Sequence, residues 1–273
     1  MPWIRQSQWL TLMKKPNQIR AKKHLSQNFL TDENIINKII QCFDLREDDH
    51  VVEIGPGYGS MTFPIIEIIG SIDVIEVDKD LVNYLNENDD QELVNVIQAD
   101  ALNYDYSMLR KKKPMRLIGN LPYHISTPIL FHLLGFSECF QDFHVMVQKE
   151  VADRMVSTHG NKTYGRLSVA IQSRCKASKV FDIKPNAFHP RPKVISSIVK
   201  LEPKTSLGNE VHSKLDEIVK IAFNQRRKKI RNSLKEIFSP QKLSDCGIDP
   251  NFRAENLSVE DYITLSKVGV RPQ

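Results

Sequence analysis

Four consecutive residues, Asn120-Leu121-Pro122-Tyr123, combine the groups needed to hold an adenine amino group for attack on an electrophilic carbon. The nitrogen of such an amino group delocalises its lone pair into the ring and is a poor nucleophile. The side-chain oxygen of Asn120 and a main-chain carbonyl at Leu121 or Pro122 could accept its two N–H hydrogens and favour a pyramidal nitrogen. The fixed φ of Pro122 would keep the carbonyl rigid, and Tyr123 could stack on the base.

A glycine-rich segment and two carboxylates could form a pocket for an adenosine-containing cofactor. Gly55 and Gly57 belong to a turn directly after an apolar run, where glycine allows the backbone to approach a ligand closely. Glu76 ends the next apolar run, where a carboxylate can accept both hydroxyl hydrogens of a ribose. Asp100 follows the third run and could accept a hydrogen bond from an adenine amino group, or simply cap a helix. These residues alone fit NAD or S-adenosylmethionine, and only Asn120-Leu121-Pro122-Tyr123 favours the latter.

A proline-stiffened loop, Phe188-His189-Pro190-Arg191-Pro192-Lys193, presents an aromatic ring. Phe188 could stack on the second face of an adenine extruded from its helix, as base-modifying enzymes require. A hydrophobic contact between two strands explains the same residue equally well. Both interpretations remain open at this stage.

A basic segment near the C-terminus is predicted to be a helix over 227–238. Ile230, Leu234 and Ile237 would form one apolar stripe, so that the cations project from the remaining faces. Such a run is usually a solvated surface, but beside an adenine-modifying site it favours contacts with RNA phosphates. The candidate phosphate-binding residues are Arg226, Arg227, Lys228, Lys229 and Arg231.

The candidate residues of the pocket all follow apolar runs that are typical of buried strands. Such runs occupy 51–54, 72–76, 94–97, 116–119 and 143–147, and helical patterns separate them. This alternation predicts an α/β fold with a mostly parallel sheet and ligands at the carboxyl ends of its strands. Two further runs, Ser178 to Ile183 and Val194 to Leu201, are predicted to form an antiparallel pair that closes the sheet.

The C-terminal part of the chain is predicted to be wholly helical. A helix is expected around Leu215 to Phe223, and another from Ser258, which forms a capping box with Asp261. We therefore expect three regions: a disordered extension over 1–19, a catalytic domain over 20–204 and a helical domain over 205–273.

Composition is that of an ordinary globular protein. The 273 residues are 41% hydrophobic and 26% charged, and the net charge of +5 permits an RNA partner without demanding one. The four cysteines are scattered, which indicates neither a zinc site nor a disulfide framework. No apolar run approaches the ~20 residues of a membrane span, and no signal peptide is evident, so we expect a cytoplasmic protein without a membrane partner.

Taken jointly, these motifs resemble the ribosomal RNA adenine dimethyltransferase family over residues 22–269. The resemblance is carried by Glu76, Asp100 and the segments Gln27–Leu30, Glu53–Gly59, Asn120–Pro128, Phe188–Val194 and Ala222–Arg227. It implies a Rossmann-like class I S-adenosylmethionine-dependent methyltransferase sheet with a small all-helical C-terminal domain and no metal. It also implies that Asn28, Leu30, Gly55, Glu76, Asp100 and Asn120 line the S-adenosylmethionine pocket.

The resemblance further implies a substrate. Two adjacent adenosines near the 3′ end of 16S rRNA would each receive two methyl groups on N6, in the 30S subunit or its precursor, during maturation. The C-terminal domain would dock on that subunit, and we expect the enzyme to be a monomer. Two residues depart from the family pattern: Ser26, where glycine is usual, and His124, where asparagine commonly follows the tyrosine.

Three alternative functions were weighed against this one. A related family methylates an adenine of large-subunit RNA, but it usually has isoleucine where this chain has Leu121, and its C-terminal segment differs from Asn224–Arg227. An NAD-dependent dehydrogenase would leave Asn120-Leu121-Pro122-Tyr123 unexplained. A non-catalytic RNA-binding assembly factor would be expected to have a defective pocket, and here the pocket residues are complete.

Overall fold

The computed structural model describes residues 21–22, 25–89 and 91–268, so the predicted extension over 1–19 lies outside the described residues. These residues form two compact units. One contains the described residues up to Lys149 together with Lys179–Leu201, and the other contains Glu150–Ser178 and the described residues from Glu202 onward. From Glu202 onward the described residues belong to the second unit, close to the expected boundary at 204. Residues 150–178 also belong to that unit, which was not expected.

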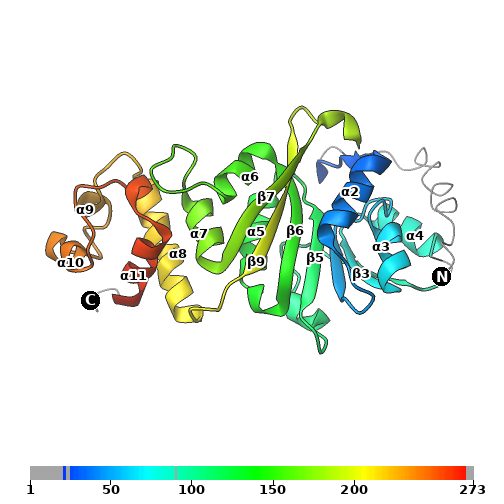
Figure 1. Cartoon of the computed structure of the whole chain (residues 1–273), viewed down its shortest axis with the longest axis horizontal. Coiled ribbons are helices and arrows are strands. Elements are labelled where there is room, and N and C mark those ends of the chain that lie inside the picture. The colour runs from blue at the N-terminus through cyan, green and yellow to red at the C-terminus, as the bar shows by residue number, and fades with distance from the viewer. Residues whose placement is uncertain (1–20, 23–24, 90, 269–273) are drawn as a thin grey trace. The chain divides into compact units, whose positions relative to one another are not determined.

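The main sheet has seven strands in the order β4-β3-β2-β5-β6-β9-β7 (Figure 1). The first five strands are parallel, and β9 is antiparallel to β6. Their bounds are β2 Val51–Ile54, β3 Ile72–Glu76, β4 Val94–Gln98, β5 Met115–Asn120, β6 Phe140–Gln148, β7 Cys175–Ile183 and β9 Ser196–Pro203. The predicted α/β class and all seven predicted strand positions are confirmed, and β7 and β9 are neighbours at the sheet edge as expected.

Among the described residues of the first unit, four helices follow the order expected from the alternating pattern. They are α2 Glu33–Phe43, α3 Thr62–Ile69, α4 Lys79–Glu87 and α5 Ser126–Leu134, joined by the short 3₁₀ helices η2 Tyr106–Leu109 and η3 Ser137–Cys139. The α2 helix begins where the Asp32 carboxylate accepts the N–H groups of Asn34 and Ile35. The apolar faces of α2 and α3 join β2 and β3 in one buried cluster, because strands covered on both sides bury every side chain.

A short two-stranded pairing lies outside the main sheet and was not predicted. β1 Phe29–Leu30 runs antiparallel to β8 Phe188–His189, just after the 3₁₀ helix η4 Pro185–Ala187. The main-chain N–H of Thr31 continues this contact by donating to the Ala187 carbonyl at 2.9 Å. The N-terminal segment is thereby held to the loop that precedes β9.

The second unit is helical and has its own core. Its helices are α6 Lys149–Met155, α7 Arg166–Arg174, α8 Asn209–Asn224, α9 Ile230–Ser233, α10 Pro240–Asp245 and α11 Val259–Val268, with the 3₁₀ helix η5 Ala254–Asn256. Helices α8 and α11 lie alongside each other (Figure 1), and Tyr164 and Val169 pack into the same cluster. Among the described residues no helix is long and apolar enough to cross a membrane.

Of two predictions for the C-terminal part, the capping box is confirmed and the basic helix is not. The capping box at Ser258 is confirmed: the Ser258 N–H donates to the Asp261 carboxylate at 2.8 Å, and the Asp261 N–H donates to the Ser258 hydroxyl at 3.0 Å. The prediction of a long basic helix over 227–238 is wrong, because only α9 is helical there. Lys229 instead forms a β-bridge with Arg253, and this pairing takes the main-chain groups that a continuous helix would need.

Candidate active site

The carboxyl ends of four parallel strands are level, which brings the predicted pocket residues to one edge of the sheet. Ile54 of β2 is in register with Ile75 of β3 and with Gly119 of β5, and Glu76 is in register with Gln98 of β4. The segments after these strands therefore meet at the same edge. This placement follows from strand register alone, as expected for open α/β sheets.

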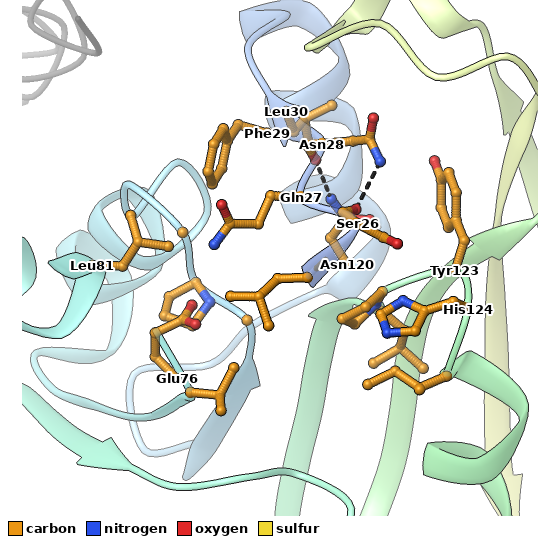
Figure 2. Close-up of a pocket in the computed structure, with 18 of the residues that line it drawn as sticks. Ser26, Gln27, Asn28, Phe29, Leu30, Glu76, Leu81, Asn120, Tyr123 and His124 are labelled. Carbon is orange, nitrogen blue, oxygen red and sulfur yellow. Dashed lines mark hydrogen bonds between the residues drawn. The ribbon is translucent and has the colours of Figure 1, made fainter. Parts of the chain in front are cut away.

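A cavity of about 310 Å³ opens at this edge. Figure 2 shows Glu76 and Leu81 on one side of it, Tyr123 and His124 on the other, and the N-terminal segment Ser26–Leu30 across it. The structure brings together nearly all of the predicted pocket and catalytic residues as its lining: Asn28, Leu30, Gly55, Gly57, Glu76, Asp100, Asn120, Leu121, Pro122 and Tyr123.

The glycine turn between β2 and α3 explains why glycine is needed here. Gly55 has φ +67° and Gly57 has φ +59°, which side chains rarely adopt. A Cβ at Gly57 would also lie only 2.9 Å from the Phe29 ring. The main chain thus reaches the cavity with no side chain in between.

Glu76 is a buried carboxylate at the end of β3, with only 6% of its surface exposed. Its Oε1 accepts the N–H of Asp78 at 2.9 Å. Burial raises its pKa to about 6, although main-chain N–H groups of Asp78 and Gly57 act in the opposite direction. A strand-end glutamate that merely faced solvent would show neither the burial nor these contacts, so this carboxylate is built into the cavity wall.

Glu53, one strand away, is a buried carboxyl group whose environment the sequence did not reveal. Its side chain is 0% exposed, and its Oε2 accepts the Thr62 hydroxyl at 2.6 Å. Burial raises its pKa to about 8, with the nearby Glu76 adding to the shift. Glu53 does not line the cavity, and its hydrogen bond joins β2 to the first residue of α3.

Asp100 lies at the cavity rim and is exposed. Its carboxylate accepts the Leu102 N–H at 2.9 Å and the Asn103 side-chain amide at 3.0 Å. It therefore caps the following turn, which was the simpler interpretation, and still faces the cavity. The two roles are compatible because a carboxylate has about four lone-pair positions.

Asn120 is held in a fixed orientation at the end of β5. Its Nδ2 donates to the main-chain oxygen of Asn28 at 2.9 Å, and the Nδ2 of Asn28 donates to the main-chain oxygen of Ser26 (Figure 2). With the amide nitrogen committed, the Oδ1 atom of Asn120 remains as the acceptor. The carbonyl of Pro122 accepts the Ile125 N–H at 3.1 Å, which leaves Leu121 as the better of the two predicted main-chain acceptors.

Tyr123 is half-buried beside the cavity and anchored by its hydroxyl group. That group lies 2.6 Å from the hydroxyl of Ser196, the first residue of β9. Burial raises the pKa of Tyr123, and the hydrogen bond with Ser196 opposes this shift. The phenol therefore stays protonated at neutral pH, and its ring has a defined position.

The N-terminal segment is tied to the cavity wall by contacts that the sequence did not predict. The Gln27 amide donates to the Asp78 carboxylate at 2.8 Å, and the Lys22 ammonium lies 2.5 Å from the same carboxylate. Burial acts to raise the pKa of Asp78, but these two hydrogen bonds outweigh it and hold the pKa below its ordinary value. Only the proximity of Gln27 to Asn28 in sequence could have signalled this role.

Two groups of predicted site residues lie outside the cavity lining. Phe188 is 4% exposed and packs in the hydrophobic cluster of the first unit, opposite Leu30 in the β1–β8 pairing. This is the hydrophobic contact that the sequence allows as the alternative to stacking on a base. The basic residues belong to the second unit, where Arg227, Lys228, Lys229 and Arg231 are exposed and Arg226 is half-buried.

Comparisons with known proteins match nearly the whole chain to one family. A model of the ribosomal RNA adenine dimethylase family matches residues 18–269. The ribosomal RNA small subunit methyltransferase A of Idiomarina loihiensis is 45% identical over 250 residues, covering 90% of this chain and 87% of that protein.

Solved structures show the same fold. A dimethyladenosine transferase from Plasmodium falciparum has a TM-score of 0.75 and 27% identity, covering 87% of this chain and 95% of that one. The 23S rRNA methyltransferase ErmE has a TM-score of 0.68 over 88% of this chain and 98% of its own, but at 23% identity it bears on the fold alone. The chain belongs to the ribosomal RNA adenine dimethylase family.

Proposed function

We propose that this protein transfers methyl groups from S-adenosylmethionine to N6 of two adjacent adenosines near the 3′ end of 16S rRNA, giving N6,N6-dimethyladenosine. Its substrate is the 30S subunit or a precursor of it, and it acts as a cytoplasmic monomer during subunit maturation. Support comes from the small-subunit relative that is 45% identical over most of the chain. The observation that carries the chemistry is the fixed Asn120 side chain at the cavity.

The cavity residues fit an adenosine-containing cofactor. Glu76 offers a carboxylate for ribose hydroxyls, and the bare main chain at Gly55 and Gly57 allows close approach. Asn28, Leu30 and Asp100 complete the binding set. When bound, S-adenosylmethionine supplies an electrophilic methyl group on a sulfonium centre.

Asn120 and Leu121 then act on the adenine amino group. The Asn120 Oδ1 atom accepts one N–H hydrogen and the Leu121 carbonyl accepts the other, which localises the nitrogen lone pair. Pro122 restricts the main chain that carries the Leu121 carbonyl. Because the reaction is a direct displacement, its acceleration comes from proximity, in-line orientation and electrostatics, with no covalent enzyme intermediate.

Tyr123 positions the target base by stacking. Its hydroxyl bond to Ser196 keeps the ring from rotating away from the cavity. Phe188 remains a second proposed stacking residue, which would require the β8 segment to shift so that the ring becomes accessible. Exposed Arg227, Lys228, Lys229 and Arg231, with Arg226, are proposed to contact rRNA phosphates.

The test is transfer of labelled methyl groups from S-adenosylmethionine to undermethylated small subunits and, separately, to large subunits, followed by mass mapping of the modified nucleosides. We expect N6,N6-dimethyladenosine at two adjacent positions of small-subunit RNA only. Asn120→Ala should abolish transfer, whereas His124→Asn, a change at the exposed cavity rim, should retain it. Label confined to large-subunit RNA would reassign the substrate, and cofactor binding without any transfer would favour an assembly factor.

A further inference from the structure

The second unit exposes an aromatic ring on a segment that pairs with a basic segment of the chain. Phe252 is 45% exposed, and its neighbours Asn251 and Arg253 are exposed as well. A single exposed apolar side chain needs no explanation on its own. What distinguishes Phe252 is its position: the segment that contains it is paired, through the main chain, with the basic segment that follows α8.

Main-chain hydrogen bonds fix this pairing. The Ile230 N–H donates to the Phe252 carbonyl at 2.6 Å, and the Arg231 N–H donates to the Pro250 carbonyl at 3.2 Å. Lys229 and Arg253 face each other in an antiparallel bridge. Two segments that are about twenty residues apart in the sequence are therefore neighbours through their backbones, independently of any flexible side chain.

Charges at this surface are mostly unneutralised. Arg226 lies 2.8 Å from the Glu255 carboxylate, and the Lys229 ammonium donates to the Asn251 side-chain oxygen. Among the described residues, no carboxylate is found within ion-pair distance of Arg227, Arg231 or Arg253. We call Lys229, Arg231, Phe252 and Arg253 the aromatic–basic surface.

We propose that the aromatic–basic surface binds an unpaired nucleotide of ribosomal RNA, with the base stacked on Phe252 and the flanking phosphates held by Lys229, Arg231 and Arg253. This inference rests on the proposed function and deepens it, because it adds Phe252 and Arg253 to the phosphate contacts proposed for Lys229 and Arg231 and states that the bound RNA is unpaired. An aromatic face beside a row of cations is the combination that single-stranded RNA requires, because bases stack while phosphates need positive charge. A loop or bulge supplies such a nucleotide, whereas a duplex hides its base faces.

The experiment measures the affinity of the full chain for undermethylated small subunits across a series of salt concentrations. Phe252→Ala should weaken binding about tenfold with an unchanged salt slope, while Phe252→Tyr should keep wild-type affinity. Arg253→Ala should lower the slope of log affinity against log salt by about 0.7–0.9, which corresponds to one lost phosphate contact. Met108→Ala is the matched control, since Met108 is 75% exposed and lies in the other unit.

Several outcomes would overturn the proposal. Wild-type affinity of Phe252→Ala, or full retention by Phe252→Leu, would exclude stacking on the ring. A photocrosslinking amino acid at position 252 should crosslink to rRNA, and a crosslink to a ribosomal protein would refute the RNA assignment. Methyl transfer to small subunits by the wild type, measured in parallel, separates these failures from failure of the proposed function, because the wild type tests the reaction without any change at Phe252.

Discussion

At the scale of single residues, the most unusual group is the buried Glu53 carboxyl of β2. Its pKa is raised to about 8 from 4.5, so between these pH values the unfolded chain loses a proton that the folded chain keeps. The unfolded state therefore binds fewer protons, and the free energy of unfolding falls as pH rises through this window. Stability associated with Glu53 is complete below about pH 4.5 and is lost progressively towards pH 8.

Glu53→Gln removes this titration and keeps an oxygen for the Thr62 hydroxyl. We expect the variant to be more stable than the wild type at pH 8 by about 2–4 kcal/mol, and the difference to shrink towards pH 5. Urea unfolding of both proteins at pH 5 and pH 8 measures this. A smaller decline of the free energy of unfolding with rising pH, caused by Glu76 with its pKa of about 6, should persist in both proteins. Parallel stability profiles would show that Glu53 does not titrate as stated.

The Tyr123 ring and its hydroxyl group make separable contributions. Tyr123→Ala removes the stacking surface and should lower kcat/KM for methyl transfer by about 10–100-fold, with little effect on S-adenosylhomocysteine affinity. Tyr123→Phe keeps the ring but loses the bond to Ser196, and should lower kcat/KM by less than about tenfold. Steady-state kinetics with small subunits and calorimetry with S-adenosylhomocysteine measure the two quantities. Equal losses in both variants would assign the effect to the hydroxyl group instead.

Sequence reasoning located the residues that follow strands but missed those that support them. Gly55, Glu76 and Asn120 could be predicted because each directly follows or ends an apolar run, and parallel strands bring such positions to one edge. The contact of Gln27 with Asp78 could not, since it joins two loops distant in the sequence. The burial of Phe188 depends on the β1–β8 pairing, which two-residue strands do not signal.

At the scale of elements, the N-terminal segment spans the cavity between two fixed points. Gln27 is bonded to Asp78 beside Glu76, and the Asn28 carbonyl is bonded to Asn120. Ser26, which directly precedes these two residues, has φ +51°, a conformation that favours glycine. A serine at this position therefore places a local backbone cost in the segment that covers the cavity.

Breaking the Gln27–Asp78 contact should release one end of this segment. Asp78→Leu and Gln27→Ala should each raise the S-adenosylhomocysteine dissociation constant, by about 5–20-fold, because a buried hydrogen-bonding group loses its partner. Asp32→Asn is the control, since Asp32 caps a helix away from Asp78 and asparagine caps equally well. Stopped-flow measurement of the rate at which S-adenosylhomocysteine dissociates tests this expectation. Dissociation rates equal to the wild type in both variants would mean that the contact does not hold the segment closed.

The elements differed in how far sequence could predict them. Strands such as 51–54 and 72–76 were predicted to the residue, because burial on both faces gives uninterrupted apolar runs. The basic helix was wrong even though Ile230, Leu234 and Ile237 are all buried as predicted. Helical spacing of three apolar residues fits a turn-rich segment equally well when a distant segment, here at Arg253, competes for the backbone.

At the scale of the whole molecule, the two compact units carry different chemistry. The cavity, Glu76 and Asn120 all belong to the first unit, and the exposed cations at 227–231 belong to the second. Cofactor binding and RNA binding should therefore respond independently to substitution. The contacts proposed for the cofactor are mostly buried and are screened weakly by salt, whereas those proposed for RNA are exposed charges that salt screens strongly.

The double variant Arg227→Ala/Lys228→Ala tests this independence. Losing two phosphate contacts should lower the slope of log affinity for small subunits against log salt by about 1.4–1.8, and S-adenosylhomocysteine affinity should stay within about twofold of wild type. Lys220→Ala/Lys267→Ala makes the same charge change at exposed positions of the same unit and should leave the salt slope unaltered. If the slope of log affinity against log salt fell equally in both double variants, net charge alone would attract the RNA. Direct phosphate contacts, by contrast, would make the effect depend on which cations are removed.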